Sequence, residues 1–207
     1  MAKLFNKVTG TSTSFISTGI TDSGASWTVD QFKDWFVIFD SIEYKITSNT
    51  VDTLVFDNSI TTNNTYEIQF IGRTFLNEIE SDIANTTKIS DDLLSKKYNQ
   101  ANADLSNKVF AYLRSNYTSD FDPLNYILNL EEMQQPFAYY LLGKVYSDLM
   151  IDHESFEGFK SYNMFEKSYN DTIKDSLSLL QLDYNKDGEA DASEKAYSVS
   201  SQTYMSR

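Results

Sequence analysis

The sequence predicts an α+β protein in which a small N-terminal antiparallel β module is followed by a C-terminal helical bundle. Up to residue 72, short segments rich in Thr, Ser, Val, Ile and aromatic residues alternate with polar turn clusters, which is typical of short strands. From residue 73 onward, apolar residues recur at steps of three and four, which is typical of amphipathic helices. Because the pattern changes once, we expect two parts, residues 1–72 and 73–207.

Composition supports a folded core and restricts the chemistry. The 207 residues are 41% hydrophobic, with 14 Tyr and 14 Phe, which is enough for one sizeable domain or two small ones. The chain contains no Cys, which excludes disulfides and thiolate metal sites. The first residues lack the apolar core of a signal peptide, and the run from Phe137 to Leu142 is far too short to cross a bilayer. We therefore expect neither export by a visible signal nor a membrane partner.

The net charge of −13 argues against a protein that wraps nucleic acid, because phosphate contacts require patches of Lys and Arg. An acidic wall repels the DNA backbone and lets DNA pass without being held. Acidity also simply keeps a protein soluble, and the charge alone does not separate these two interpretations.

Five strands are expected in the first part of the chain. They are Ser14–Thr18, Trp35–Phe39, Ile42–Thr47, Thr53–Phe56 and Tyr66–Ile71. Polar clusters such as Ser48-Asn-Thr50 mark the turns, and such close spacing predicts a small antiparallel sheet or barrel. The stretch from Ser26 to Asp30, followed by Phe32 and Trp35, predicts a short helical or turn segment that covers one end.

Part of this module resembles a small β module that recurs in phage virion proteins. The resemblance lies in Trp27-Thr-Val-Asp-Gln-Phe32, in Ile46-Thr-Ser-Asn-Thr50 and in Thr53-Leu-Val-Phe56, and it covers roughly residues 17–58. Asp34 stands where that module usually has a Gly before its second aromatic strand, so we expect the turn to differ there.

The second part is expected to be helical. Ser90, followed by Asp91 and Asp92, predicts a helix start, since acids favour the positive end of the helix dipole. A single apolar stripe follows, made of Leu94, Tyr98, Ala101, Leu105, Val109 and Tyr112. Asp122-Pro123 predicts a second start, with Ile127 and Leu128 among the apolar residues behind it.

Two further helices are predicted. Pro136 ends the previous helix or begins the next, and Phe137 to Ile151 is apolar enough to be the buried central helix. Glu154 to Leu182 carries the longest apolar pattern and is expected to lead directly into Asp183. Ser193 to Arg207 is expected to be a final short helix or a tail.

The stretch from Asp183 to Glu194 has the spacing of an EF-hand calcium loop, with Gly188 at the sharp turn. The predicted ligands of a structural Ca²⁺ are Asp183, Asn185, Asp187, Glu189 through its backbone carbonyl, Asp191 and Glu194. The alternative is a metal-free helical hairpin in which Gly188 relieves strain. Ala190 favours this alternative, because EF-hands usually place a larger apolar residue at that position.

Catalysis is not expected. His153 is the single His, and without Cys the chain offers neither a Cys–His pair nor a His-rich metal site. The scattered glycines form no phosphate-binding loop. Adjacent acids such as Asp91-Asp92 and Glu131-Glu132 are better explained as helix ends and solvated faces than as acid–base pairs. The prediction is therefore that this chain is not an enzyme.

The order of a β module, a helical bundle and an acidic loop before the C-terminal tail resembles the head–tail connector (adaptor) proteins of tailed phages. That resemblance implies a virion protein, assembled in the host cytoplasm, that forms a ring, typically of twelve copies, beneath the portal. It also implies that residues 195–207 dock on the portal, that neck or tail proteins bind the opposite face, and that DNA passes through the lumen unbound. The alternatives are another neck, tail or baseplate structural protein, and a single-loop calcium-binding module.

Overall fold

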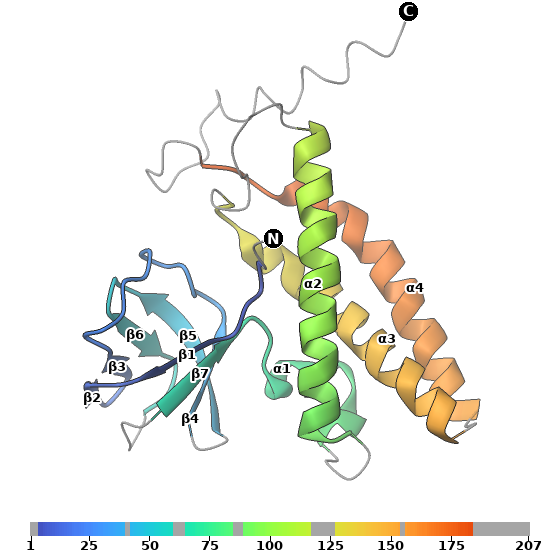
Figure 1. Cartoon of the computed structure of the whole chain (residues 1–207), viewed down its shortest axis with the longest axis horizontal. Helices are drawn as coiled ribbons and strands as arrows, with labels where there is room; N and C mark the ends of the chain where they lie inside the picture. The colour runs from blue at the N-terminus through green and yellow to red at the C-terminus, as the bar shows by residue number, and fades with distance from the viewer. Residues whose placement is uncertain are drawn as a thin grey trace, which may run out of the picture. The chain divides into compact units, whose positions relative to one another are not determined.

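The computed structural model describes residues 4–39, 42–59, 65–84, 89–116, 127–153 and 156–183 (Figure 1). The predicted α+β class is confirmed, because the N-terminal half contains a seven-stranded antiparallel sheet and the C-terminal half contains helices. The strands are β1 (Val8–Thr11), β2 (Ser14–Ile16), β3 (Gly19–Thr21), β4 (Phe36–Phe39), β5 (Ile42–Asn49), β6 (Thr53–Phe56) and β7 (Thr65–Gln69). The helices are α1 (Arg73–Ile79), η1 (Ser81–Ala84), α2 (Asp91–Asn116), η3 (Leu130–Met133), α3 (Gln134–His153) and α4 (Phe156–Leu179).

The chain forms two compact units. One, here called the β unit, is Phe5–Asp91, and the other, the helical unit, combines Met1–Leu4 with Asp92–Arg207. This division falls beyond the predicted one at residue 72, because α1 and η1 belong with the sheet. The Glu43 carboxylate accepts the backbone N–H of Thr74 at 2.7 Å, and the Arg73 guanidinium donates to the Ile89 carbonyl at 2.9 Å. The apolar periodicity of the sequence indicates where helices begin. The contacts of Glu43 and Arg73 determine that α1 and η1 are part of the β unit.

The strand order of the sheet is β1-β7-β4-β5-β6-β3-β2, and every pairing is antiparallel. The long strand β5 pairs with β4 through its first half and with β6 through its second, and the register shifts between Ile46 and Ser48. Such an irregularity increases the local twist and bends the sheet. All five predicted strands are present, Thr53–Phe56 with the predicted ends and the other four with shifted ends. Strands β1 and β3 were not predicted, because each is short and contains Gly.

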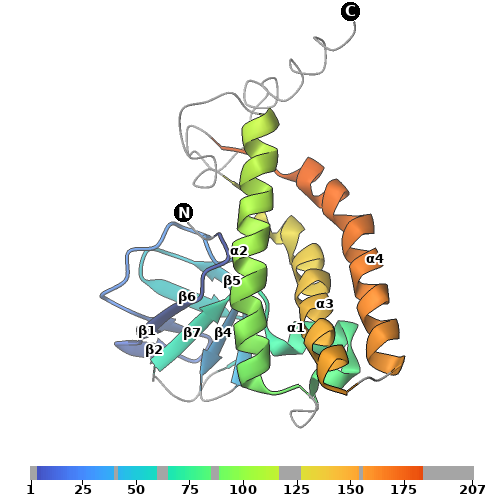
Figure 2. The ribbon, with the colours of Figure 1, turned by 45° about the vertical axis from the view of Figure 1, so that its right-hand side comes forward.

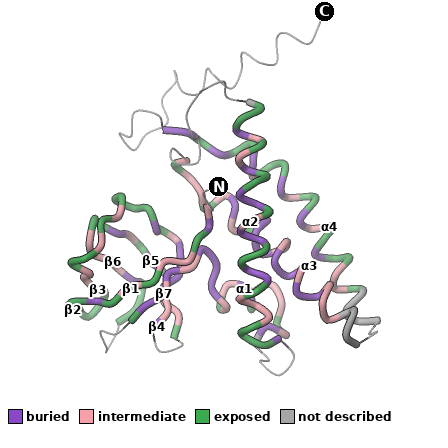
Figure 3. The backbone as a smooth tube through the Cα atoms, viewed as in Figure 1, coloured by how far each residue is buried: buried purple, intermediate pink, exposed green. Residues whose placement is uncertain are grey.

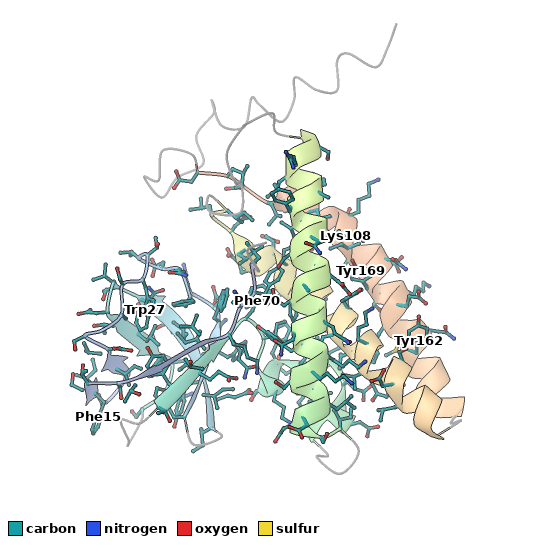
Figure 4. All side chains as sticks on the ribbon, viewed as in Figure 1. Phe15, Trp27, Phe70, Lys108, Tyr162 and Tyr169 are labelled. Carbon is teal, nitrogen blue, oxygen red and sulfur yellow. The ribbon has the colours of Figure 1, made fainter. Side chains whose placement is uncertain are left out.

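Aromatic side chains fill the core of the β unit (Figure 4). Phe70 is central, since its ring lies 4.6 Å from that of Phe5 and 5.1 Å from that of Trp35. Phe32 continues the row, 5.3 Å from Trp35 and 5.8 Å from Trp27. Most of these pairs are edge-to-face or tilted, the geometries that ring quadrupoles favour. The predicted covering segment is therefore present, as a series of turns between Val29 and Asp34.

In the helical unit, α3 and α4 pack side by side (Figures 1 and 2). The predicted central helix is confirmed, since Phe137, Leu141, Leu142 and Val145 are completely buried in α3. Four members of the predicted stripe on α2 are also buried (Figure 3), namely Tyr98, Ala101, Leu105 and Val109. In the described part of the chain, no helix combines the length and apolar character that crossing a membrane requires.

Two predictions about helix ends are wrong. Helix α4 ends at Leu179, three residues before the expected end at Leu182. Ile127 and Leu128, expected in a helix, are not helical, and Ile127 instead forms an isolated antiparallel β-bridge with Leu182. The predicted helix start at Asp122-Pro123 and everything after Asp183 lie outside the described residues.

Candidate functional site

The predicted calcium loop enters the described structure at its first position only. Asp183 is described and 7% exposed, whereas Asn185, Asp187, Glu189, Asp191 and Glu194 lie outside the described residues. The part of the candidate site that the structure shows is therefore the base from which the C-terminal segment departs. We call this base the C-terminal clamp and define it as residues 127–129 and 179–182.

The clamp is a short antiparallel contact between two chain segments. The Asn129 side chain bonds to backbone groups at the end of α4 and just after it. The Leu128 N–H donates to the Gln181 carbonyl at 3.0 Å, next to the bridge between Ile127 and Leu182. The Asn129 side-chain oxygen accepts the Gln181 N–H at 2.7 Å, and its amide nitrogen donates to the Leu179 carbonyl at 2.9 Å. The last carbonyls of a helix have no partner within the helix, so one amide here satisfies the end of α4 and the chain beyond it.

Burial shows that the clamp is anchored at one side and apolar at the other. Leu180 and Leu182 are 5% and 3% exposed, so the chain reaches Asp183 from a fixed and buried position. Leu128 and Leu179 are 39% and 54% exposed and leave an apolar rim on the clamp. Exposed apolar side chains at one place are a common feature of interaction surfaces.

Sequence reasoning missed the clamp, although Asn129 offered a signal. Asn is favoured immediately before a helix, and Asn129 does precede η3. Its side chain makes no capping bond to η3 and instead reaches Leu179 and Gln181, about fifty residues later in the chain. A partner at that separation cannot be read from local sequence.

The predicted ligands have the chemistry that Ca²⁺ requires, since they are carboxylate, amide and carbonyl oxygens. The entry differs from that of an EF-hand, because the non-helical residues Leu180, Gln181 and Leu182 separate α4 from the first ligand position. Within the described ranges, no group of three or more His, Cys, Asp or Glu side chains is placed to hold a metal ion. Any calcium site therefore depends on ligands beyond Asp183.

A second polar cluster joins the three long helices (Figure 4). The Tyr140 hydroxyl of α3 donates to the Asp104 carboxylate of α2 at 2.7 Å, and Lys144 lies 3.5 Å from the same carboxylate. Lys108 of α2 donates to the Tyr169 hydroxyl of α4 at 2.9 Å. Burial, followed by the hydrogen bond to Asp104, raises the pKa of Tyr140. A phenol with a raised pKa stays protonated and acts as a donor, so this cluster fixes the helices relative to one another.

The sheet carries an open depression of about 420 Å³. Its lining residues are Thr9, Gly10, Thr11, Ile38, Thr65, Tyr66 and Glu67. Tyr66 donates to the Asp22 carboxylate at 2.7 Å, and burial with this bond raises the pKa of Tyr66. Glu67 pairs with Lys7 at 2.8 Å. Both titratable groups of the depression are thus engaged in bonds within the β unit.

The residues that resemble the virion β module meet at Asn49, which is 1% exposed. Its side-chain oxygen accepts the Phe32 N–H at 2.8 Å, and its amide nitrogen donates to the carbonyls of Thr28 at 2.7 Å and Thr50 at 2.8 Å. One amide therefore connects the two quoted segments. Such a buried group is costly unless each polar atom has a partner.

Asp34, where the sequence resemblance led us to expect a Gly, has a φ of 66°, in the left-handed region that Gly adopts without strain. Asp tolerates this conformation better than most residues. Its carboxylate also pairs with Lys45 at 2.7 Å. The turn thus has the backbone that a Gly would favour, and the Asp side chain provides an ion pair.

The chain matches no protein-family model, no curated protein and no solved structure, so proposals about its function rest on its own residues and geometry.

Proposed function

We propose that this chain is a structural virion protein of a tailed phage, a head–tail connector that assembles in the host cytoplasm as a ring of about twelve copies beneath the portal. The observation that carries the proposal is the C-terminal clamp, which holds the chain through Asn129 up to Asp183. In this proposal residues 195–207 dock on the portal, and neck or tail proteins bind the opposite face.

The clamp favours docking by the segment that follows it. Ordering a free chain on a partner costs conformational entropy for each residue that becomes fixed. Because residues 179–182 are already held by hydrogen bonds and burial, they add little to that cost. The exposed Leu128 and Leu179 extend the same surface with apolar area.

Two properties of the whole chain support the same proposal. Its order of β module, helical bundle and acidic loop resembles that of head–tail connector proteins. Its net charge of −13 is suited to the lining of a ring through which DNA passes, because acidic side chains repel phosphate. The function is thus mechanical, with no chemical step.

We also propose that Asp183, Asn185, Asp187, Glu189, Asp191 and Glu194 hold a structural Ca²⁺. The ion would fix the direction in which the chain leaves the clamp, since Asp183 is the first ligand and is itself buried. A thermal shift with millimolar Ca²⁺ tests this directly, because an ion that binds only the folded state raises the melting temperature. Asp187→Asn with Glu194→Gln should abolish the shift, and a wild-type chain without any shift would show a metal-free loop.

The connector proposal is tested by deleting residues 195–207. The deletion should abolish binding to the portal protein of the same virus, while circular dichroism and melting temperature stay as in the full chain. Asn129→Ala should weaken the same binding, because it removes both side-chain bonds of the clamp. Undiminished binding by the deleted chain would refute docking through this segment.

Negative-stain imaging of the full chain, alone and with the portal, separates the proposal from its alternatives. Rings of about twelvefold symmetry on the portal support the connector. Rings or tubes that do not bind the portal would indicate another neck or tail protein. A monomer whose stability depends on calcium would indicate a calcium-binding module.

A further inference from the structure

Helix α2 has many exposed positions (Figure 3), and five residues between 99 and 111 form one side that carries no charged residue. We call this face the α2 stripe and define it as Asn99, Gln100, Ala103, Asn107 and Ala111. The steps of three and four residues place them on one side of the helix. Four of the five are exposed, and Ala103 is half-buried.

The charged residues of the same segment point elsewhere. Asp104 bonds to Tyr140 and lies near Lys144, and Lys108 bonds to Tyr169, so both are directed toward α3 and α4. The stripe is therefore left with amides and small side chains alone. This composition differs from that of a helix face whose role is only to meet water.

Helix α4 provides the comparison within the same unit. Its exposed residues are mainly charged, and they include Lys160, Glu166, Lys167, Asp171, Lys174 and Asp175. Such alternation of sign along a helix is typical of a solvated face. The exposed face of α4 is thus rich in charged residues, whereas the α2 stripe of the same unit has none.

Cations stand at both ends of the stripe. Lys96 and Arg114 are exposed and lie eighteen residues apart, which is five helical turns, so they share its side of α2. Arg114 lies over the Phe110 ring with 5.6 Å to its centroid. In a chain with a net charge of −13, copies repel one another wherever acids face acids. The α2 stripe has amides in the middle and cations at its ends. It therefore does not repel an acidic surface of another copy, and its cations attract the acidic groups there.

We infer that the α2 stripe is the surface through which one copy of this chain packs against an acidic surface of a neighbouring copy. The inference rests on the proposed ring and names its subunit contact. Between Lys96 and Arg114 the contact runs for about 27 Å of helix. Ala103 and Ala111 let the neighbour approach closely, while the amides supply hydrogen bonds across the contact. Since the acidic surface is a different patch from the stripe, the contact is head-to-tail, which is the kind that closes rings.

Because the chain contains no Cys, a single introduced thiol reports on the stripe. Asn107→Cys places the thiol in the stripe, and Asn170→Cys places a matched control on the exposed face of α4. Maleimide labelling is followed from micromolar to millimolar protein, with sedimentation velocity giving the assembly state. In the assembled state labelling of Cys at 107 should slow by about tenfold or more, since thiol reactivity requires access, while labelling at 170 stays unchanged.

Charge insertion provides the second measurement. Ala103→Glu with Asn107→Glu should prevent assembly, whereas Asn163→Glu with Asn170→Glu on α4 should permit it, with circular dichroism checking that both variants fold. Rings that form with position 107 still fully reactive would overturn the inference and leave the ring proposal standing. A chain that stays monomeric at every concentration and also forms no ring on the portal would overturn both.

Discussion

At the scale of single residues, buried amides hold the backbone where no regular secondary structure does. Asn49 fixes the turns between Thr28 and Phe32, and Asn129 fixes the end of α4. In both cases one side chain serves as donor and acceptor for separate backbone groups. This use of Asn suits irregular segments, whose N–H and C=O groups would otherwise lack partners.

Asn49→Ala should destabilise the β unit by about 2–4 kcal/mol, because it leaves one N–H and two carbonyls of a buried turn without their side-chain partner. Urea unfolding monitored by Trp fluorescence measures the loss. The exposed Asn58→Ala is the matched control and should stay within about 0.5 kcal/mol of the wild type. A loss below that of the control would show that Asn49 does not hold the turn.

Tyr140 makes stability depend on alkaline pH. Burial and Asp104 raise the pKa of Tyr140 in the folded chain, and Tyr162 and Tyr169 add to the effect. An unfolded chain loses the phenolic proton near its ordinary pKa of about 10, whereas the folded chain keeps it. The stabilisation is thus fully present below about pH 10 and is lost as the pH rises toward the folded value.

Tyr140→Phe should therefore show a shallower fall of unfolding free energy above about pH 10 than the wild type. Urea unfolding at a series of pH values measures the slope. Tyr139→Phe is the control, since the Tyr139 hydroxyl accepts from the neutral amide of Gln135 at 3.0 Å. Equal slopes for wild type and Tyr140→Phe would contradict the assignment.

Single residues also mark where prediction from sequence stops. Asn49 and Asp34 lie in segments that the sequence already singled out, yet neither the buried amide nor the left-handed φ follows from residue type. The Asn49 amide bonds to Thr28 and Phe32 in a preceding turn segment, and Asp34 pairs with Lys45 of β5. The predicted calcium ligands illustrate the other limit, because their spacing is readable while only Asp183 lies in the described structure.

At the scale of elements, apolar periodicity predicted the long helices well because it reports directly on which face is buried. It failed for Lys97, Asn102 and Ser106, which are buried on α2 although they are polar. Ser106 donates to Asn102 at 3.1 Å and accepts the Leu4 N–H at 2.8 Å, so these groups are satisfied by neighbours. The clamp was missed for a related reason, since contacts between residues about fifty positions apart define it.

Lys97 illustrates the energetics of such a buried polar group. Its ammonium lies 2.6 Å from the Asp148 carboxylate of α3, with 8% of the Lys side chain and 32% of the Asp side chain exposed. Asp148→Ala should cost about 1–3 kcal/mol, because it removes the carboxylate beside a nearly buried cation. Lys97→Met should stay within about 1 kcal/mol, because the apolar chain fills the same volume without desolvating a charge. Denaturant unfolding of both variants measures the asymmetry, and equal losses would contradict it.

At the scale of the whole molecule, the chain contains two cores, each with its own kind of packing. The β unit packs edge-to-face rings around Trp35. The helical unit combines buried Leu and Val of α3 with ring contacts such as Tyr98–Phe137 and with polar links between helices. The chain passes between the units at Leu4–Phe5 and at Asp91–Asp92. The sequence predicted two parts because their periodicities differ, but it placed the division at the end of the sheet.

Two separate cores should give two unfolding transitions, because all-or-none behaviour belongs to single cooperative units. Trp27 and Trp35 lie in the β unit, so Trp fluorescence reports on that unit, while far-ultraviolet circular dichroism is dominated by the helices. Asn49→Ala should lower the unfolding midpoint measured by fluorescence and leave the midpoint measured by circular dichroism unchanged. Asp148→Ala should lower the circular dichroism midpoint and leave the fluorescence midpoint unchanged. Coincident midpoints that shift together in both variants would show that the two units unfold as one.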